Sequence, residues 1–273
     1  MSNFTRIEQI KLPKSARIVV NESGDTVFNK DTVSSIAQNA KAARDIWNDF
    51  AHDKKLCECF HLRPTASGIS VISILHYAPM RGISVQRSEL KNVLTDIAGE
   101  TGVLLGVKVD ESLKLMKKWG FKNRESKNKN SENFIEENAQ AFFIHGMILK
   151  QSMYEGINFV ASELVLADKS SRFDIVGYKA GTLYIFEMKK DRTLAGLTQT
   201  AGYATLINDN KSLFLEVLRN YPHYPVDDFE KVVAVAVMQY AANSVTLLEK
   251  KAKEAGVGLW FYERSIALRK ASI

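Results

Sequence analysis

Apolar residues in the first half of the chain recur mainly at helical spacing. Between positions 31 and 53 they repeat every three or four residues, which predicts an amphipathic helix. The same spacing predicts two further helices over 84–100 and 110–120. The apolar segment 68–78 could form a strand or a helix, because a run of this length does not distinguish the two periods.

Short apolar runs alternate with helical segments in the second half of the chain. Runs rich in β-branched and aromatic residues, bounded by turn residues, predict buried strands. We expect strands over 157–167, 172–178, 182–190, 231–239 and 257–263. We expect helices over 133–150, 194–208, 213–220 and 243–255. This order of elements predicts an α/β domain built on one sheet.

The second and third of these strands predict a hairpin that carries charged residues in an apolar setting. Asp174 lies in its first strand, and Glu187 and Lys189 share one face of its second strand because side chains alternate. A two-residue turn would set Asp174 opposite Glu187, whereas a three-residue turn with a bulge would shift the strands by one residue. Buried acids are costly unless they are paired or bind a metal. A salt-bridged cluster with Arg172 is one interpretation, but we favour a hard-cation site, since Mg²⁺ prefers carboxylate oxygens.

The hairpin and the helix after it carry six residues at the spacing of a known motif: Asp174, Glu187, Met188, Lys189, Gln199 and Tyr203. The pattern resembles the core motif of the PD-(D/E)XK nuclease superfamily. The QxxxY spacing resembles that of the subgroup with RecB-like exonuclease domains. Phe173 stands where the family usually has its leading proline. The resemblance covers about residues 132–273 and implies a restriction-endonuclease-like α/β fold, a mixed-sheet core in the order αβββαβ flanked by helices.

The resemblance also implies a role for each of these residues. Asp174 and Glu187 would bind Mg²⁺ or Mn²⁺, and Lys189 would position or activate the attacking water. Gln199 and Tyr203 would orient the phosphate or support the metal ligands. Further acids that the resemblance places near the metal are Glu163 and one glutamate of the preceding helix, for which we favour Glu137 over Glu132 and Glu136.

The net charge of +6 is unevenly distributed along the chain. Residues 1–130 contain 21 basic and 14 acidic residues, whereas residues 131–273 contain 16 and 17. A basic first part joined to a second part with clustered acids suits a polyanion-binding region attached to a metal site. We therefore predict a mainly helical, DNA-binding region over 1–130 and a nuclease domain over 131–273.

Basic residues are concentrated near the end of the first region. The side chains that we expect to contact DNA are Lys114, Lys117, Lys118, Lys122, Arg124, Lys127 and Lys129, together with Arg172 of the hairpin. The two helices before them could form a winged helix or a helix-turn-helix, or a small helical domain whose lysines are only solvated. The polar segment 122–131 predicts a linker or a loop that faces nucleic acid.

Two further features concern metal binding and location. The only cysteines, Cys57 and Cys59, have a spacing that matches no common zinc module, so we expect reduced thiols. The apolar run 232–238 is too short to cross a bilayer, and the N-terminus lacks the apolar core of a signal peptide. These features predict a cytoplasmic protein without a membrane partner.

The sequence thus predicts a Mg²⁺-dependent deoxyribonuclease, an endonuclease or an exonuclease, that acts in DNA repair, restriction or defence. DNA is the expected partner, and a homodimer remains open. One alternative is a non-catalytic nucleic-acid-binding protein that uses the nuclease fold, and another is a metal-free scaffold. We favour the enzyme because Asp174, Glu187 and Lys189 are all present.

Overall fold

The computed structural model of the chain describes residues 30–75, 82–104, 109–122, 132–165, 172–189, 194–240, 245–262 and 268–270. Its helices are α1 (Lys30–Phe50), α2 (Lys54–Cys59), α3 (Leu90–Ala98), α4 (Thr101–Leu104), α5 (Val109–Lys118), α6 (Glu132–Ile148), α7 (Leu194–Asp209), α8 (Lys211–Leu218) and α9 (Val245–Ala255). Its strands are β1 (Phe60–Thr65), β2 (Gly68–Ser73), β3 (Ile83–Val85), β4 (Asn158–Val165), β5 (Arg172–Lys179), β6 (Thr182–Lys189), β7 (Lys231–Gln239), β8 (Gly258–Tyr262) and β9 (Leu268–Lys270). None of the helices in the described part of the chain has both the length and the apolar character that a membrane crossing requires.

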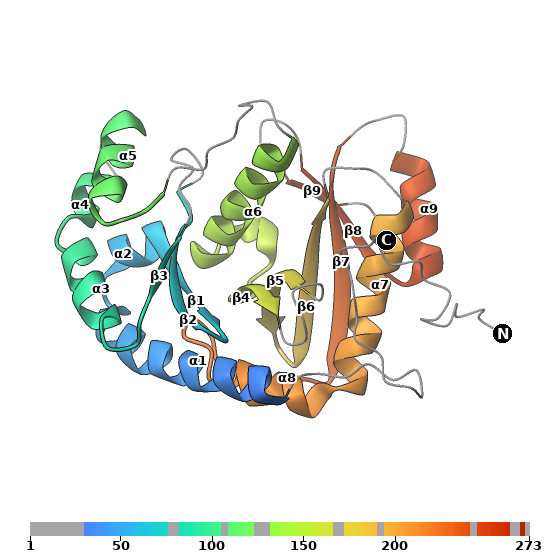
Figure 1. Cartoon of the computed structure of the whole chain (residues 1–273). Coiled ribbons are helices and arrows are strands. Elements are labelled where there is room, and N and C mark those ends of the chain that lie inside the picture. Colours follow the sequence, from blue (N-terminus) through green and yellow to red (C-terminus); the bar gives the residue numbers. More distant parts are fainter. Residues whose placement is uncertain are drawn as a thin grey trace.

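The larger of the two sheets is mixed and has the strand order β4-β5-β6-β7-β8-β9 (Figure 1). Strands β4, β5 and β6 form an antiparallel meander, β6, β7 and β8 run parallel, and β9 returns antiparallel to β8. The central strands are nearly continuous apolar runs, as expected where both faces of a sheet are covered. The chain is therefore a mixed α/β protein, as its sequence predicts.

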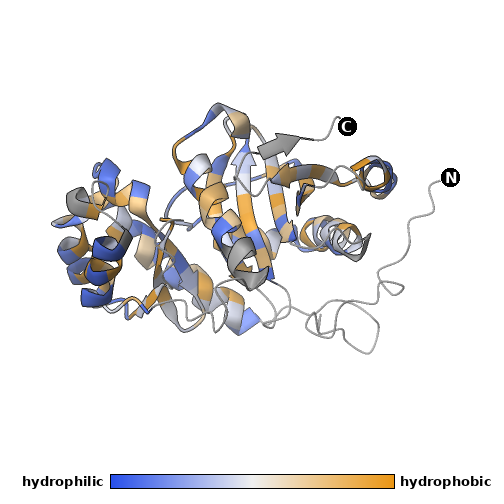
Figure 2. Cartoon of the chain, turned by 90° about the horizontal axis from the view of Figure 1, so that it is seen from above, coloured by the Kyte–Doolittle hydropathy of each residue, from blue (hydrophilic) through white to orange (hydrophobic). Residues whose placement is uncertain are grey.

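Helices cover both faces of the larger sheet (Figure 1). On one face, Phe143 of α6 packs in a cluster with Phe186 of β6 and Trp260 of β8. On the other face, residues of α1, α7 and α8 pack against Phe173 and Ile185, while α9 packs beside them on β7 and β8. Figure 2 shows the hydrophobic residues concentrated in the strands of this sheet. Each large side chain buried in this way stabilises the fold by roughly 2 kcal/mol.

The region before α6 contains more strand than the sequence analysis expects. β1, β2 and β3 form an antiparallel sheet, against which the helices α1 to α5 pack. Ser84 and Val85, expected in a helix, belong to β3, and the following helix begins at Leu90. Helices nevertheless remain longer in total than strands among the described residues before α6, so this part is mainly helical with a small sheet. The strand β2 depends on tertiary packing, because Ile69 and Val71 alternate toward the core of this region as strand residues do.

Helix α1 belongs to both cores of the molecule. Val33 and Ile36 in its first half pack in the cluster beneath the larger sheet. Ala43 and Trp47 in its second half pack in the cluster with the smaller sheet. The smaller sheet therefore lies beside the larger one, with α1 extending along both (Figure 1). Removing the first part of the chain would expose apolar surface of the larger sheet.

Candidate active site

The β5–β6 hairpin brings the predicted acids to the same level of the sheet. Lys179 pairs with Thr182 across a two-residue turn, in which Ala180 and Gly181 have φ of +45° and +78°. Two consecutive positive φ values are typical of the type I′ turn, whose twist suits a hairpin. The two-residue alternative is thus the one adopted. Its register runs to Ile175 and Phe186, which leaves the next residues of the two strands, Asp174 and Glu187, facing each other.

Asp174 is a buried carboxylate held by hydrogen bonds on both sides. Its Oδ2 accepts from the backbone N–H of Met188 at 2.9 Å, and its backbone carbonyl accepts from Nε2 of Gln140 in α6 at 3.0 Å. Burial raises the pKa of Asp174, while the charge of Lys189, the Met188 N–H and the charge of Arg172 act to lower it. The raised pKa means that a nearby positive charge would stabilise the ionised form.

Glu187 and Lys189 form a buried ion pair on the face of β6 that α7 covers. Lys189 Nζ lies 2.6 Å from Glu187 Oε1, and the two side chains are 23% and 4% exposed. The alternation along β6 places both on one face, as the sequence predicts. The partial exposure of Lys189 keeps its ammonium within reach of solvent and of a ligand at the end of the hairpin.

Helix α7 brings the two residues of the QxxxY pattern next to the hairpin. Gln199 Nε2 donates to the Tyr203 hydroxyl at 2.7 Å, and this hydroxyl donates to the carbonyl of Arg172 at 3.4 Å. Burial, followed by the negative charge of Glu187, raises the pKa of Tyr203, so the phenol stays protonated. Gly196 allows this close packing, because a Cβ there would lie 3.2 Å from Cγ of Lys189.

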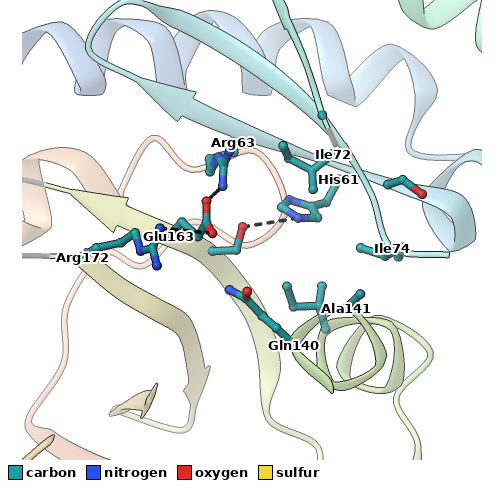
Figure 3. Close-up of a pocket in the computed structure, with 12 residues that line it drawn as sticks. His61, Arg63, Ile72, Ile74, Gln140, Ala141, Glu163 and Arg172 are labelled. Atoms are coloured by element: carbon teal, nitrogen blue, oxygen red, sulfur yellow. Dashed lines mark hydrogen bonds and ion pairs between the residues drawn. The ribbon is translucent and has the colours of Figure 1, made fainter. Parts of the chain in front are cut away.

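Glu163 lies in β4, where its carboxylate pairs with two arginines. Arg63 of β1 forms an ion pair with Oε2, and Arg172 of β5 lies 3.6 Å from Oε1 (Figure 3). The backbone of Glu163 has a φ of +46°, unlike the extended residues around it. Among the described residues, no three His, Cys, Asp or Glu side chains come together as a metal site. Asp174 and Glu187 thus form a pair of acids with no third such side chain beside them among the described residues, and the carboxylate of Glu163 is engaged by the two arginines.

Several predicted residues lie apart from this site or outside the described side chains. The side chains of Glu132, Glu136 and Glu137, on the first turns of α6, are outside the described residues, as are Arg124, Lys127 and Lys129. Lys114, Lys117 and Lys118 are exposed on α5 and Lys122 is exposed beyond it, while Lys118 Nζ lies 2.6 Å from Glu100. Of the predicted DNA contacts that the structure describes, only Arg172 adjoins the hairpin acids, with a side chain that is 53% exposed.

Cys57 and Cys59 are free thiols at the end of α2. Burial, with the negative charges of Asp53 and Glu58, raises the pKa of Cys57 to about 11 and that of Cys59 to about 12. Both thiols are therefore protonated at neutral pH, which suits neither metal ligation nor nucleophilic chemistry.

Sequence reasoning missed three polar residues near the site: Gln140, Arg63 and His61. Gln140 follows Glu137 by three residues, so helical spacing alone places it on the same side of α6 and could have marked it. Arg63 and His61 come from β1, more than 100 residues away from Asp174, and nothing in the sequence pattern connects them to it.

Comparison with known proteins adds no relative to this picture. No protein-family model matches the chain, and no curated protein or solved structure is significantly similar to it. The nuclease resemblance therefore depends on the residues of the hairpin and of α7.

Proposed function

We propose that the protein is a metal-dependent nuclease that hydrolyses DNA phosphodiester bonds. The observation that carries this proposal is the grouping of Asp174, Glu187 and Lys189 at one end of the β5–β6 hairpin, with Lys189 Nζ 2.6 Å from the Glu187 carboxylate. Two acids and an ammonium in a largely buried setting match the needs of phosphodiester hydrolysis. That reaction requires a hard cation and compensation for the negative charge that develops on the phosphate.

The donor atoms at this position suit Mg²⁺ or Mn²⁺. Asp174 and Glu187 would hold the ion, with help from the carbonyl of Met188, the residue after Glu187. Mg²⁺ commonly binds to proteins through one or two carboxylates and keeps several waters, so two acids suffice. Burial raises the pKa of Asp174, so a bound cation would stabilise its ionised form. When bound, the ion would supply Lewis-acid activation of water and neutralisation of phosphate charge.

The remaining side chains would position the reactants. The Lys189 ammonium would donate a hydrogen bond to the attacking water or to a phosphate oxygen, exchanging part of its present contact with Glu187. Tyr203, oriented by the 2.7 Å hydrogen bond from Gln199, would fix the position of α7 against the hairpin through its hydrogen bond to the Arg172 carbonyl. The protonated phenol could also donate to a phosphate oxygen.

The decisive experiment compares cleavage by the wild type, Lys189→Ala and Lys179→Ala under single-turnover conditions. Lys179 is the matched control, because it lies at the other end of the same hairpin, where its Nζ donates to the Glu155 carbonyl. We expect cleavage only with Mg²⁺ or Mn²⁺, a rate that is lower by about 100-fold or more in Lys189→Ala, and little change in the control. Full activity in EDTA would exclude the proposed metal mechanism.

One observation favours a second candidate, a nucleic-acid-binding protein without catalysis. The Glu187–Lys189 pair satisfies both charges within the protein, as a structural ion pair would. This candidate predicts that Mn²⁺ leaves the melting temperature unchanged and that the wild type binds DNA without cleaving it. A thermal melt with and without Mn²⁺, combined with the cleavage assay above, distinguishes the two candidates.

A further inference from the structure

A cavity of about 400 Å³ lies between the smaller sheet, β4, β5 and α6 (Figure 3). Its volume falls in the range of small-molecule sites, roughly 300–1,000 Å³. The residues around it come from both sheets and from α6, so the cavity exists because the two sheets lie side by side, with β1 next to β4. The roles proposed above for Asp174, Glu187, Lys189, Gln199 and Tyr203 do not use this space.

One end of the cavity is cationic. Arg63, Glu163 and Arg172 gather there, and the Glu163 carboxylate contacts both guanidinium groups (Figure 3). Two arginines and one carboxylate leave one positive charge. Arginine is well suited to phosphate, because its planar group can donate two parallel hydrogen bonds. The left-handed backbone conformation of Glu163 is unusual for a strand residue, and such conformations concentrate at binding sites.

The other end of the cavity is apolar, and polar groups lie between the two ends. Ile74 and Ala141 line the apolar end (Figure 3). Gln140 projects between the ends, as does His61, whose Nε2 lies 3.3 Å from the hydroxyl of Ser162. A nucleotide has the same sequence of chemical properties, with a charged phosphate, a polar sugar and base edge, and an apolar base face.

Two contacts connect the cavity to the hairpin acids. Gln140 lines the cavity and donates to the backbone carbonyl of Asp174 at 3.0 Å. Arg172 also lines it, two residues before Asp174, and its carbonyl accepts from Tyr203. A phosphate at the cationic end would therefore lie near a phosphate at Asp174 and Glu187, as neighbouring phosphates of one strand do.

We infer that this cavity receives one unpaired nucleotide of the strand that is cut, with its phosphate on Arg63 and Arg172 and its base against Ile74 and Ala141. This inference rests on the proposed function and adds its substrate class. A base paired within a duplex cannot enter a pocket of this size without leaving the stack. Single-stranded ends and unpaired nucleotides are therefore the preferred substrates over intact duplex.

Glu163 has a defined role in this arrangement, as a competitor for the phosphate. Its carboxylate contacts both arginines, and an incoming phosphate replaces it. Glu163→Gln keeps the shape of the side chain but removes the charge, so the variant binds the nucleotide more tightly than the wild type. If Glu163 were a metal ligand instead, the same substitution would weaken binding of Mn²⁺ and leave metal-free nucleotide binding unchanged.

The test measures binding by calorimetry in EDTA, where no cleavage interferes, using the full chain. The probes are 5′-phosphorylated tetrathymidylate, thymidine monophosphate and thymidine. Ala141→Met fills the apolar end from a half-buried helix position, and Arg172→Gln removes one phosphate contact. Ala255→Met on the exposed end of α9 is the matched control. A charge-assisted hydrogen bond accounts for roughly tenfold or more in affinity.

We expect the tetranucleotide to bind more tightly than the mononucleotide, and thymidine to bind weakest. Arg172→Gln and Ala141→Met should each lose about tenfold in affinity, Glu163→Gln should gain affinity, and Ala255→Met should match the wild type. Unchanged affinity in both cavity variants would overturn the inference. A mononucleotide that binds as tightly as the tetranucleotide would overturn the assignment to a DNA strand.

Failure of the inference is distinguishable from failure of the proposed function. One outcome is that the wild type cleaves DNA with Mn²⁺ and the cavity variants bind and cleave like the wild type. This supports the nuclease and excludes the nucleotide site. The other outcome is that no DNA is cleaved but the affinity for the tetranucleotide depends on Arg172 and Ala141. This supports the nucleotide site and excludes the nuclease. A second arm compares cleavage of a duplex with single-stranded ends against a covalently closed duplex. The preference for the first should disappear in Ala141→Met.

Discussion

The carboxylate of Asp174 accepts a hydrogen bond from the backbone N–H of Met188 across the hairpin, at 2.9 Å. This bond continues the strand pairing one step beyond Ile175 and Phe186, with a side chain in place of a backbone carbonyl. It fixes Asp174 beside Glu187 at the end of the hairpin, although burial raises the pKa of Asp174. The fold thus holds an acid where a cation would stabilise it.

Replacing Asp174 by Asn should separate its structural from its metal-binding role. Asn can keep an acceptor for the Met188 N–H but carries no charge. Without metal, Asp174→Asn should unfold at the same temperature as the wild type or higher, because no charge is buried. With Mn²⁺ at 100 times its Kd, the wild type should gain about 2.7 kcal/mol of unfolding free energy and the variant much less. Thermal unfolding with and without Mn²⁺ measures both effects.

The control for this substitution is Asp209→Asn, at the exposed end of α7. It removes the same charge from the protein but lies away from the hairpin acids, so it should respond to Mn²⁺ as the wild type does. An equal gain in the Asp174 and Asp209 variants would show that Asp174 does not bind the metal.

Gln199 and Tyr203 should behave as one unit in catalysis. Gln199→Ala and Tyr203→Phe each break the 2.7 Å hydrogen bond between them, so each should slow cleavage, by roughly tenfold. The double variant should be little slower than either single variant, because the shared bond is lost only once. Single-turnover rates of the four proteins give the coupling, with Tyr224→Phe as a control outside the site. Additive effects would mean that the two side chains contact the substrate separately.

The hairpin and the helix after it were predictable because their signals are local. The alternation of Leu183, Ile185 and Glu187 predicts the strand, and Ala180-Gly181 supplies the turn. The register stayed open between two alternatives, because turn length depends on the φ that Ala180 adopts. That value, +45°, is one that alanine rarely takes and that pairing of the strands imposes.

The remaining features depend on contacts between distant segments. The pattern of α1 shows an apolar face but not that Val33 and Trp47 enter two different cores. The approach of Arg63 to Glu163 joins residues that are 100 positions apart, and only the packing of β1 beside β4 creates it. The cavity could not be predicted for the same reason.

Two histidines whose pKa is lowered by the fold should make the protein less stable in mild acid. His223 Nε2 accepts from the backbone N–H of Leu62 at 2.8 Å, and burial lowers the pKa of His223 to about 3. Burial also lowers the pKa of His61 well below its usual value. In the unfolded chain both would titrate near pH 6.5. As the pH falls below 6.5, the unfolded state takes up protons that the folded state does not. The free energy of unfolding then decreases by up to about 1.4 kcal/mol per pH unit for each histidine.

Urea unfolding at pH 7 and pH 5, followed by tryptophan fluorescence, measures this loss, since Trp47 contacts the His223 ring. His223→Gln should be less stable than the wild type at pH 7 but should lose less stability on going to pH 5. His52→Gln, at an exposed position, should keep the wild-type pH dependence. If His223→Gln loses as much stability as the wild type, the acid sensitivity comes from other groups.

The last prediction concerns the basic residues of α5. Because α1 packs into both cores, deleting the first region would disturb the larger sheet, so charge substitutions are the sharper test. Phosphate contacts release counterions, which makes DNA affinity depend on salt with a slope of about −0.9 per contact for duplex DNA. If Lys114, Lys117 and Lys122 each contact a phosphate, replacing all three by Gln should reduce the slope by about 2.7 and weaken binding at low salt.

The matched control replaces three other exposed lysines by Gln: Lys231, Lys250 and Lys253. It removes the same amount of charge from β7 and α9, which lie away from α5. It should therefore lower DNA affinity only through net charge and leave most of the salt slope intact. Fluorescence anisotropy across a salt series, with folding checked by circular dichroism, compares the three proteins on one labelled duplex. Equal slopes for the two triple variants would show that α5 makes no specific phosphate contacts. The region before α6 would then have a structural role, since it contains the smaller sheet that lines one side of the cavity.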